Sequence, residues 1–135
     1  MRIFISYRFT GENPEELNET MKNICDILER KGHKTSCSLW KGDFFKKNNF
    51  TNKKILEYAL KELDDSDIYL AFIKSKDKSE GMLIEAGYAL AKGKKFVLVI
   101  KKDIKTTFMH ELANKIIKFK DLKDFYEKLD KTIIR

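Results

Sequence analysis

Two short runs of apolar residues constrain the fold of this chain more than any other feature. Residues 68–73 read IYLAFI and residues 96–100 read FVLVI, and neither run contains a charged side chain. A strand with one solvated face alternates apolar and polar residues, whereas a central parallel strand is covered on both faces and is apolar throughout. The two runs therefore predict central strands of a parallel sheet with helices on both sides.

Amphipathic segments alternate with three further strand candidates, at residues 3–5, 34–39 and 116–119. Helices are predicted from Pro14 to a stop at Gly32, over residues 55–63, from Gly81 onward, and over residues 109–115 and 122–133. Residues 40–50 (WKGDFFKKNNF) are expected to be irregular. In the helix that begins near Gly81, the side chains expected to face the sheet are Leu83, Ala86, Ala89 and Leu90.

Five strands with helices between them predict an α/β fold, a doubly wound sheet in the flavodoxin-like order 2-1-3-4-5. In this order the first and third strands are neighbours, and the connections after them leave toward opposite faces. The loops at residues 6–13 and 74–81 should therefore meet at a crevice at the carboxyl ends of the strands, where ligands bind in such sheets.

Length and composition agree with one such domain over residues 1–135. The chain has 42% apolar residues, one proline, and a formal net charge of +7, which favours anionic partners without choosing among them. The lysines are mixed with acidic residues on every predicted helix, a pattern typical of a solvated surface, so a nucleic-acid polymer is not expected as a partner. No run is long enough to span a membrane or to form a signal-peptide core, so we expect a cytoplasmic protein with no membrane contact.

Neither a metal nor a cofactor is expected. The two cysteines and two histidines are far apart in sequence and lack zinc-site spacing. Cys25 and Cys37 are instead expected to be small buried apolar residues.

The predicted crevice contains groups suited to a phosphate. Arg8, the hydroxyls of both loops and the free N–H groups at the start of the Gly81 helix form a plausible cradle, although ordinary solvated loops have the same composition. Glu85 lies within the first two turns of that helix, where its positive end should keep the carboxylate ionised as a nucleophile. The alternative is that Glu85 only complements the helix dipole. Gly87 beside it permits close approach of a ligand or another backbone.

The segment from residue 66 to 100 resembles the core motif of the nucleoside 2-deoxyribosyltransferase superfamily. The matching residues are Gly81-x-x-x-Glu85-x-Gly87-Tyr88-Ala89, followed by Gly93-Lys94. The resemblance implies a flavodoxin-like fold and chemistry at an N-glycosidic bond, with Glu85 as the nucleophile that attacks the anomeric carbon. It implies substrate binding by Ser6, Tyr7, Arg8, Ser79, Gly81, Gly87 and Tyr88.

Two features resemble the 2′-deoxynucleoside 5′-phosphate N-hydrolases of this superfamily. Ser79, six residues before the nucleophile, stands where the transferases have an aspartate, and Ser6-x-Arg8 is similar to the hydrolases' first loop. A serine can donate to a phosphate that an aspartate would repel. The resemblance therefore implies a nucleoside 5′-monophosphate substrate and, as in other members, a homodimer in which Thr106 or Thr107 reaches a neighbour's phosphate.

The sequence also departs from the family pattern. Ala59 stands where the family usually has a second acidic residue, with Glu57 and Glu62 nearby but out of register, and Arg2 or Ile3 replaces the tyrosine of the first strand. A weak or non-catalytic nucleotide-binding or signalling module is therefore an alternative. Another comes from FISYRFTGE, which resembles the opening of TIR domains and would imply NAD cleavage.

The segment after the second strand combines aromatic and basic residues. Such rings can stack on a base and would cover it in this family, but they can equally fill the edge of the sheet or a subunit interface. The residues concerned are Trp40, Phe44, Phe45 and Phe50, interspersed with Lys41, Lys46 and Lys47.

Overall fold

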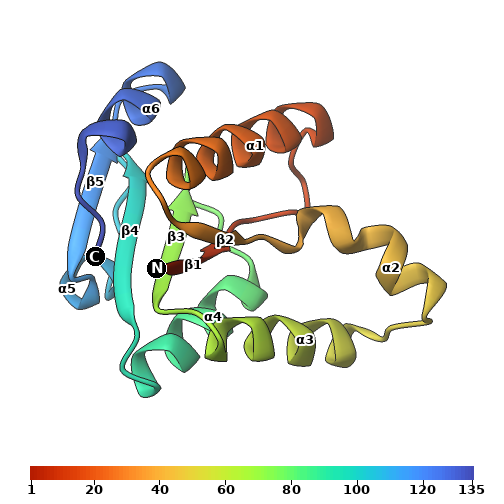
Figure 1. The fold of residues 1–135 in the computed structure, drawn as a ribbon. Helices are drawn as coiled ribbons and strands as arrows, with labels where there is room; N and C mark the ends of the chain where they lie inside the picture. The colour runs from red at the N-terminus through yellow and green to blue at the C-terminus, as the bar shows by residue number, and fades with distance from the viewer.

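The computed structural model describes residues 1–135 and contains a five-stranded sheet with helices on both faces (Figure 1). The strand order is β2-β1-β3-β4-β5 and every neighbouring pair is parallel. The predicted flavodoxin-like order is therefore confirmed. The strands are β1 (Arg2–Ser6), β2 (Lys34–Ser36), β3 (Ile68–Ile73), β4 (Lys95–Lys101) and β5 (Lys115–Phe119).

Helices α1 and α6 cover one face of the sheet, and α3 and α4 cover the other (Figure 1). Four helices begin at a side chain that accepts a hydrogen bond from the backbone N–H three residues later, which satisfies one of the free donors of the first turn. None of the helices is long and apolar enough to cross a membrane. The helices are α1 (Pro14–Arg30), α2 (Gly42–Lys47), α3 (Asn52–Asp64), α4 (Glu80–Ala91), α5 (Met109–Leu112) and α6 (Leu122–Lys131).

Alternation along each strand divides the core into two halves. On β1, Ile3 and Ile5 belong to the cluster under α1 and α6, whereas Phe4 belongs to the cluster under α3 and α4. Because side chains on a strand alternate between faces, Arg2 and Ser6 share the face of Phe4. The α3/α4 face of β1 therefore carries a polar residue at each end and a phenylalanine between them.

The second strand and the segment after it differ from the prediction. β2 ends at Ser36 instead of residue 39, because it is an edge strand and pairs only with Arg2–Phe4 of β1. A 3-10 helix (Ser38–Lys41) and α2 follow where an irregular segment was expected. Four rings pack against one another here, with centroids 5.2–6.3 Å apart, and hold α2 against α3: Phe44, Phe45, Phe50 and Tyr58.

Two helix ends and one helix face also differ. α5 ends at Leu112 because the backbone and side chain of Asn114 both bond to Phe96, which draws the chain into the sheet at β5. α6 ends at Lys131, two residues before the predicted end. On α4, Leu83 does not face the sheet but is 50% exposed. The buried side chains there are Met82, Ala86 and Ala89, which follow one another at the four- and three-residue spacing of a single helix face.

The two cysteines are free thiols. Cys25 is buried in the cluster under α1 and α6, and Cys37 packs against its edge while keeping some exposure. The expectation of small apolar packing residues holds fully for Cys25 and in part for Cys37.

Truncation of Phe125 tests the packing of α6. Its ring lies 5.4 Å from Phe72 and 5.2 Å from Phe119, and it is fully buried. We expect Phe125→Ala to lower the free energy of unfolding by about 3–5 kcal/mol in urea titrations, because it leaves a cavity. Phe108→Ala is the control, since Phe108 is 68% exposed and should lose less than about 0.5 kcal/mol. Equal losses would contradict the assignment of α6 to the core.

Candidate active site

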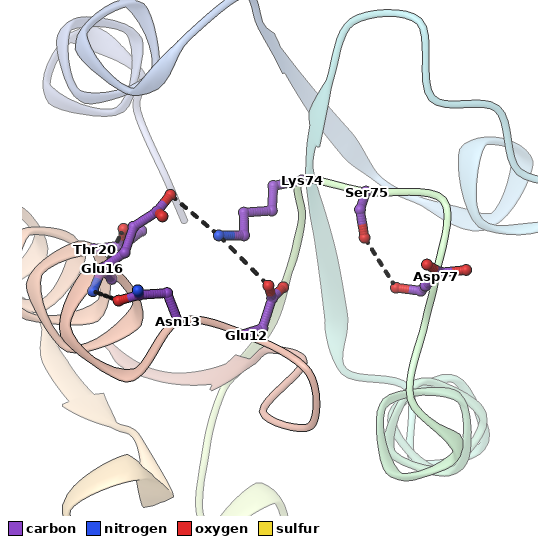
Figure 2. A network of polar contacts seen from close by, with 7 residues as sticks. All are labelled: Glu12, Asn13, Glu16, Thr20, Lys74, Ser75 and Asp77. Carbon is purple, nitrogen blue, oxygen red and sulfur yellow. Dashed lines mark hydrogen bonds and ion pairs between the residues drawn. The ribbon is translucent and has the colours of Figure 1, made fainter.

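The loops after β1 and β3 meet at the carboxyl end of the sheet, as predicted. Lys74, the first residue after β3, lies 3.6 Å from the Glu12 carboxylate and 3.3 Å from that of Glu16 (Figure 2). Residues of both loops, including Arg8 and Ser75, line a narrow hollow between them. The pairing of β1 with β3 thus creates the expected crevice.

The acidic partners of Lys74 are Glu12, at the end of the first loop, and Glu16, in the first turn of α1. Asn13 caps this helix by accepting a 3.0 Å hydrogen bond from the Glu16 N–H, and Thr20 donates to the Glu16 carbonyl (Figure 2). On the opposite loop, the Ser75 hydroxyl donates to the Asp77 carbonyl over 3.4 Å. Lys74 therefore ties the two loops together, and its charge is already balanced by two carboxylates.

Arg8 differs from Lys74 because it makes no hydrogen bond or ion pair within the chain. Its guanidinium lies against Gly11, where an added Cβ would be 2.8 Å from Nη2. Gly11 also has a φ of 82°, a conformation that other residues rarely adopt. The glycine thus gives the first loop a tight turn that leaves room for an uncommitted cation at the crevice.

The N-terminus of α4 borders the same crevice. The Ser79 hydroxyl caps it by accepting a 3.1 Å hydrogen bond from the Met82 N–H. The N–H groups of Glu80 and Gly81 make no hydrogen bond within the chain. Such free donors, together with the helix dipole, favour an anion, although the exposed Glu80 side chain adds a negative charge nearby.

Glu85 is joined to the end of β1. The Ser6 hydroxyl donates a 2.7 Å hydrogen bond to its carboxylate, and Ser6 itself is buried. The buried ring of Tyr69 on β3 lies in the same cluster as Phe4, and its hydroxyl donates to the Met82 carbonyl over 3.1 Å. The predicted residues Ser6 and Glu85, 79 positions apart, are therefore in direct contact.

The protonation of Glu85 differs from the one predicted from the sequence, because the carboxyl group is largely removed from water. The sequence predicts that the positive end of α4 keeps this carboxylate ionised, but burial raises the pKa of Glu85 to about 7, and the hydrogen bond from Ser6 only partly opposes the rise. Glu85 is the sixth residue of α4, beyond the first turn in which the dipole acts most strongly. Near pH 7 the group is thus divided between its neutral acid form and its ionised carboxylate form.

Two tyrosines border this carboxyl. Burial raises the pKa of Tyr7 and Tyr69 well above the usual range, so both remain neutral phenols. The Tyr7 hydroxyl lies 3.2 Å from the Ser38 hydroxyl, on the 3-10 helix. Sequence reasoning missed Ser38 and Tyr69, although the alternation of β3 would have placed Tyr69 on the face of Glu85.

Two residues of the predicted site lie elsewhere. The Tyr88 hydroxyl donates to the Asp64 carboxylate, 2.7 and 2.8 Å from its oxygens, at the far end of α3. Gly87 is exposed, and an added Cβ would meet no atom within 4 Å, so no close approach requires a glycine there within one chain. Thr106, which the family resemblance assigned to a neighbour's phosphate, lies 2.6 Å from His110 Nδ1 of its own chain.

A second polar group lies on the same face of the sheet. Glu62 on α3 forms an ion pair with Arg2 and accepts a 3.2 Å hydrogen bond from the Ser36 hydroxyl. It lines a pocket together with Ala59, the residue that replaces the second acid of the resemblance. Sequence reasoning noted Glu62 only as out of register, because spacing along the chain does not show which way a side chain turns.

Sequence comparison assigns the family. The sequence model of the nucleoside 2-deoxyribosyltransferase family matches residues 6–119, which include both loops and Glu85. The chain belongs to this family. No curated protein matches the sequence at a significant level.

Solved structures with the same fold include two proteins of described activity. A CMP N-glycosidase from Clostridium botulinum is 21% identical, with a TM-score of 0.70, and the match covers 96% of this chain and 98% of that one. A 2-deoxyribosyltransferase from Bacillus psychrosaccharolyticus is 16% identical, with a TM-score of 0.71, covering 99% and 93%. A conserved protein from Enterococcus faecalis is 12% identical, with a TM-score of 0.65, covering 98% and 99%.

The raised pKa of Glu85 predicts a pH-dependent gain in stability for Glu85→Gln. Between the unfolded pKa, near 4.5, and the folded value of about 7, the folded state binds more protons, so wild-type stability falls as pH rises through this range. Glutamine carries no charge and still accepts from Ser6. We expect the variant to be more stable than wild type by roughly 1–3 kcal/mol at pH 8, with a much smaller difference at pH 4.5.

Urea titrations at the two pH values measure this difference. Glu57→Gln is the matched control, because Glu57 is exposed on α3 and its substitution should change stability by less than about 0.5 kcal/mol. A stability difference for Glu85→Gln that is the same at both pH values would refute the buried-carboxyl assignment.

Proposed function

We propose that this protein cleaves the N-glycosidic bond of a nucleoside 5′-monophosphate, with Glu85 as the nucleophile. The observation that carries the proposal is the partly buried Glu85 carboxyl, bonded to Ser6 at 2.7 Å beside a crevice with an uncommitted arginine. Membership of the nucleoside 2-deoxyribosyltransferase family supports chemistry at this type of bond. The similarity to a CMP N-glycosidase supports a nucleotide as substrate.

The hydrogen bond from Ser6 gives the carboxyl a fixed orientation. Burial removes water from it, which makes the ionised form more reactive, and a pKa near 7 leaves a large fraction ionised at neutral pH. Ser6 donates to one oxygen, Oε1, and no donor is bonded to the other. The second oxygen is therefore the one available to attack an anomeric carbon.

The reaction then has two steps. In the first, a Glu85 oxygen bonds to the anomeric carbon while the bond to the base nitrogen breaks, and the base leaves with that electron pair and takes up one proton. In the second, water adds its oxygen to the anomeric carbon and loses one proton, the Glu85 ester bond breaks, and the sugar phosphate is released with the carboxylate restored. A second base in place of water would give transfer instead of hydrolysis.

The phosphate is assigned to Arg8, Ser79 and the first N–H groups of α4. Arg8 is free of carboxylate partners, whereas the neighbouring Lys74 is not. The Ser79 hydroxyl accepts from Met82 and so retains its own proton for donation. A charged donor, a neutral hydroxyl and a helix N-terminus together suit a phosphate monoester.

Base release from nucleotides tests the nucleophile. Wild type should release free base from at least one member of a chromatographic panel of ribo- and deoxyribonucleoside monophosphates, with NAD included for the TIR-like alternative. We expect Glu85→Gln to slow release at least 10³-fold and Glu57→Gln to leave it unchanged. The wild-type rate should fall below pH 7 as Glu85 becomes protonated, since the neutral acid is a poor nucleophile.

The result also separates the alternatives. Equal slow release by wild type and Glu85→Gln would overturn the catalytic role. Nucleotide-dependent thermal stabilisation without any turnover would instead indicate a non-catalytic binding module.

Substitution of Arg8 tests the phosphate site. We expect Arg8→Gln to raise KM for a nucleoside monophosphate about 10–100-fold, because it removes a charge-assisted hydrogen bond, and to leave the corresponding nucleoside unaffected. Arg30→Gln is the control, since Arg30 is exposed and paired with Asp130 at 2.8 Å. An equal loss for nucleoside and nucleotide would place the phosphate elsewhere.

A further inference from the structure

A pocket of about 210 Å³ opens between the start of β1, β2 and α3. It lies on the same face of the sheet as Glu85, because Arg2, Phe4 and Ser6 alternate to that face. Its wall also includes Ser38, the partner of Tyr7 beside Glu85. Ser38 and Tyr7 thus link the pocket to the end of β1 at which Ser6 contacts Glu85.

The size and lining of this pocket suit a nucleobase. Ser6 and Arg2 are four residues apart on one strand, or about 13 Å, a distance that a base can fill together with the side chains at its two ends. The middle is apolar, with Phe4 and the small side chain of Ala59 in the lining. A sugar placed at Glu85 would direct its base along this apolar middle toward Arg2.

The far end of the pocket is polar and organised. Glu62 pairs with Arg2 and accepts from Ser36 through the same oxygen, Oε2, whereas its Oε1 makes no hydrogen bond. The side chains of Arg2 and Glu62 are only 37% and 27% exposed. The ion pair and the Ser36 hydroxyl fix the carboxylate in place and leave one of its oxygens as an acceptor for a ligand.

We propose that Glu62 is a specificity-determining residue that selects a base with an exocyclic amino group, cytosine in preference to uracil. This inference rests on the proposed nucleotide function. The amino group of cytosine donates to a carboxylate oxygen, a pairing that Asp and Glu also use to read cytosine in DNA. Uracil has a carbonyl at that position, which would face the carboxylate with no hydrogen between two acceptors.

Paired substrates test the proposal. We expect wild type to favour CMP over UMP, and dCMP over dUMP, by about 10–100-fold in kcat/KM. Glu62→Gln should reduce this preference to about threefold or less, because an amide can turn either its donor or its acceptor to the base. Glu57 lies five residues earlier on α3 and is exposed, so the control variant Glu57→Gln should keep the wild-type preference. A purely structural role for Glu62 would lower activity on both bases equally.

Binding measurements keep this test independent of turnover. In the Glu85→Gln background, calorimetry with CMP and UMP should show the same preference in Kd, and adding Glu62→Gln should remove it. An unchanged Kd ratio, or no binding of either nucleotide, would overturn the role of Glu62. Failure of the proposed function is recognised separately, as an absence of Glu85-dependent base release while CMP-selective binding persists.

Discussion

The hydrogen bond between Ser6 and Glu85 depends on the parallel pairing of β1 with β3. The connection after β1 leads into α1 on one face of the sheet, and the connection after β3 leads into α4 on the other. The carboxyl ends of the two strands therefore stay open between diverging chains. Lys74 then fixes the separation of the loops by pairing with Glu12 and Glu16. A serine at the end of β1 meets a glutamate in the second turn of α4 as a result of this topology.

The position of Glu85 entails a compromise between stability and reactivity. Burial raises its pKa to about 7, which means that the ionised form costs folding free energy at neutral pH. An exposed glutamate would avoid this cost but would be more solvated and therefore weaker in the nucleophilic role proposed above. Ser6 limits the cost by donating to the carboxylate, so the hydrogen bond stabilises the fold and keeps part of the population ionised.

The sheet order and the crevice could be predicted from sequence because both depend on hydrophobic pattern and topology. The fully apolar runs at β3 and β4 and the alternation of strands with helices suffice for them. Ser6, Arg8, Ser79 and Glu85 could be placed near this crevice from sequence because they follow strands or lie in the first turns of a helix. The orientation of individual side chains was less predictable. Leu83 lies on an exposed face of α4, and Tyr88 turns toward Asp64, since packing between helices decides which apolar or aromatic residues become buried.

The charge at the crevice could not be predicted from the sequence either. The net charge of +7 suggests that cations are plentiful, yet the site contains one lysine that two carboxylates neutralise and one arginine that none contacts. A count of residues does not distinguish Lys74 from Arg8, but only Arg8 has a charge that is free to attract an anion.

The replacement of the family's second acid by Ala59 has a similar explanation in the geometry of α3. Glu62 follows Ala59 by three residues, so it lies on nearly the same face of the helix about one turn further along. α3 runs toward the start of β3, and one turn in this direction moves a carboxylate away from Glu85 and toward Arg2. An acid at position 59 would face the middle of the pocket, closer to Glu85. At position 62 it faces the far end, where it would contact the outer edge of a base. Moving a carboxylate by one turn along α3 thus changes the part of a bound base that this carboxylate would contact.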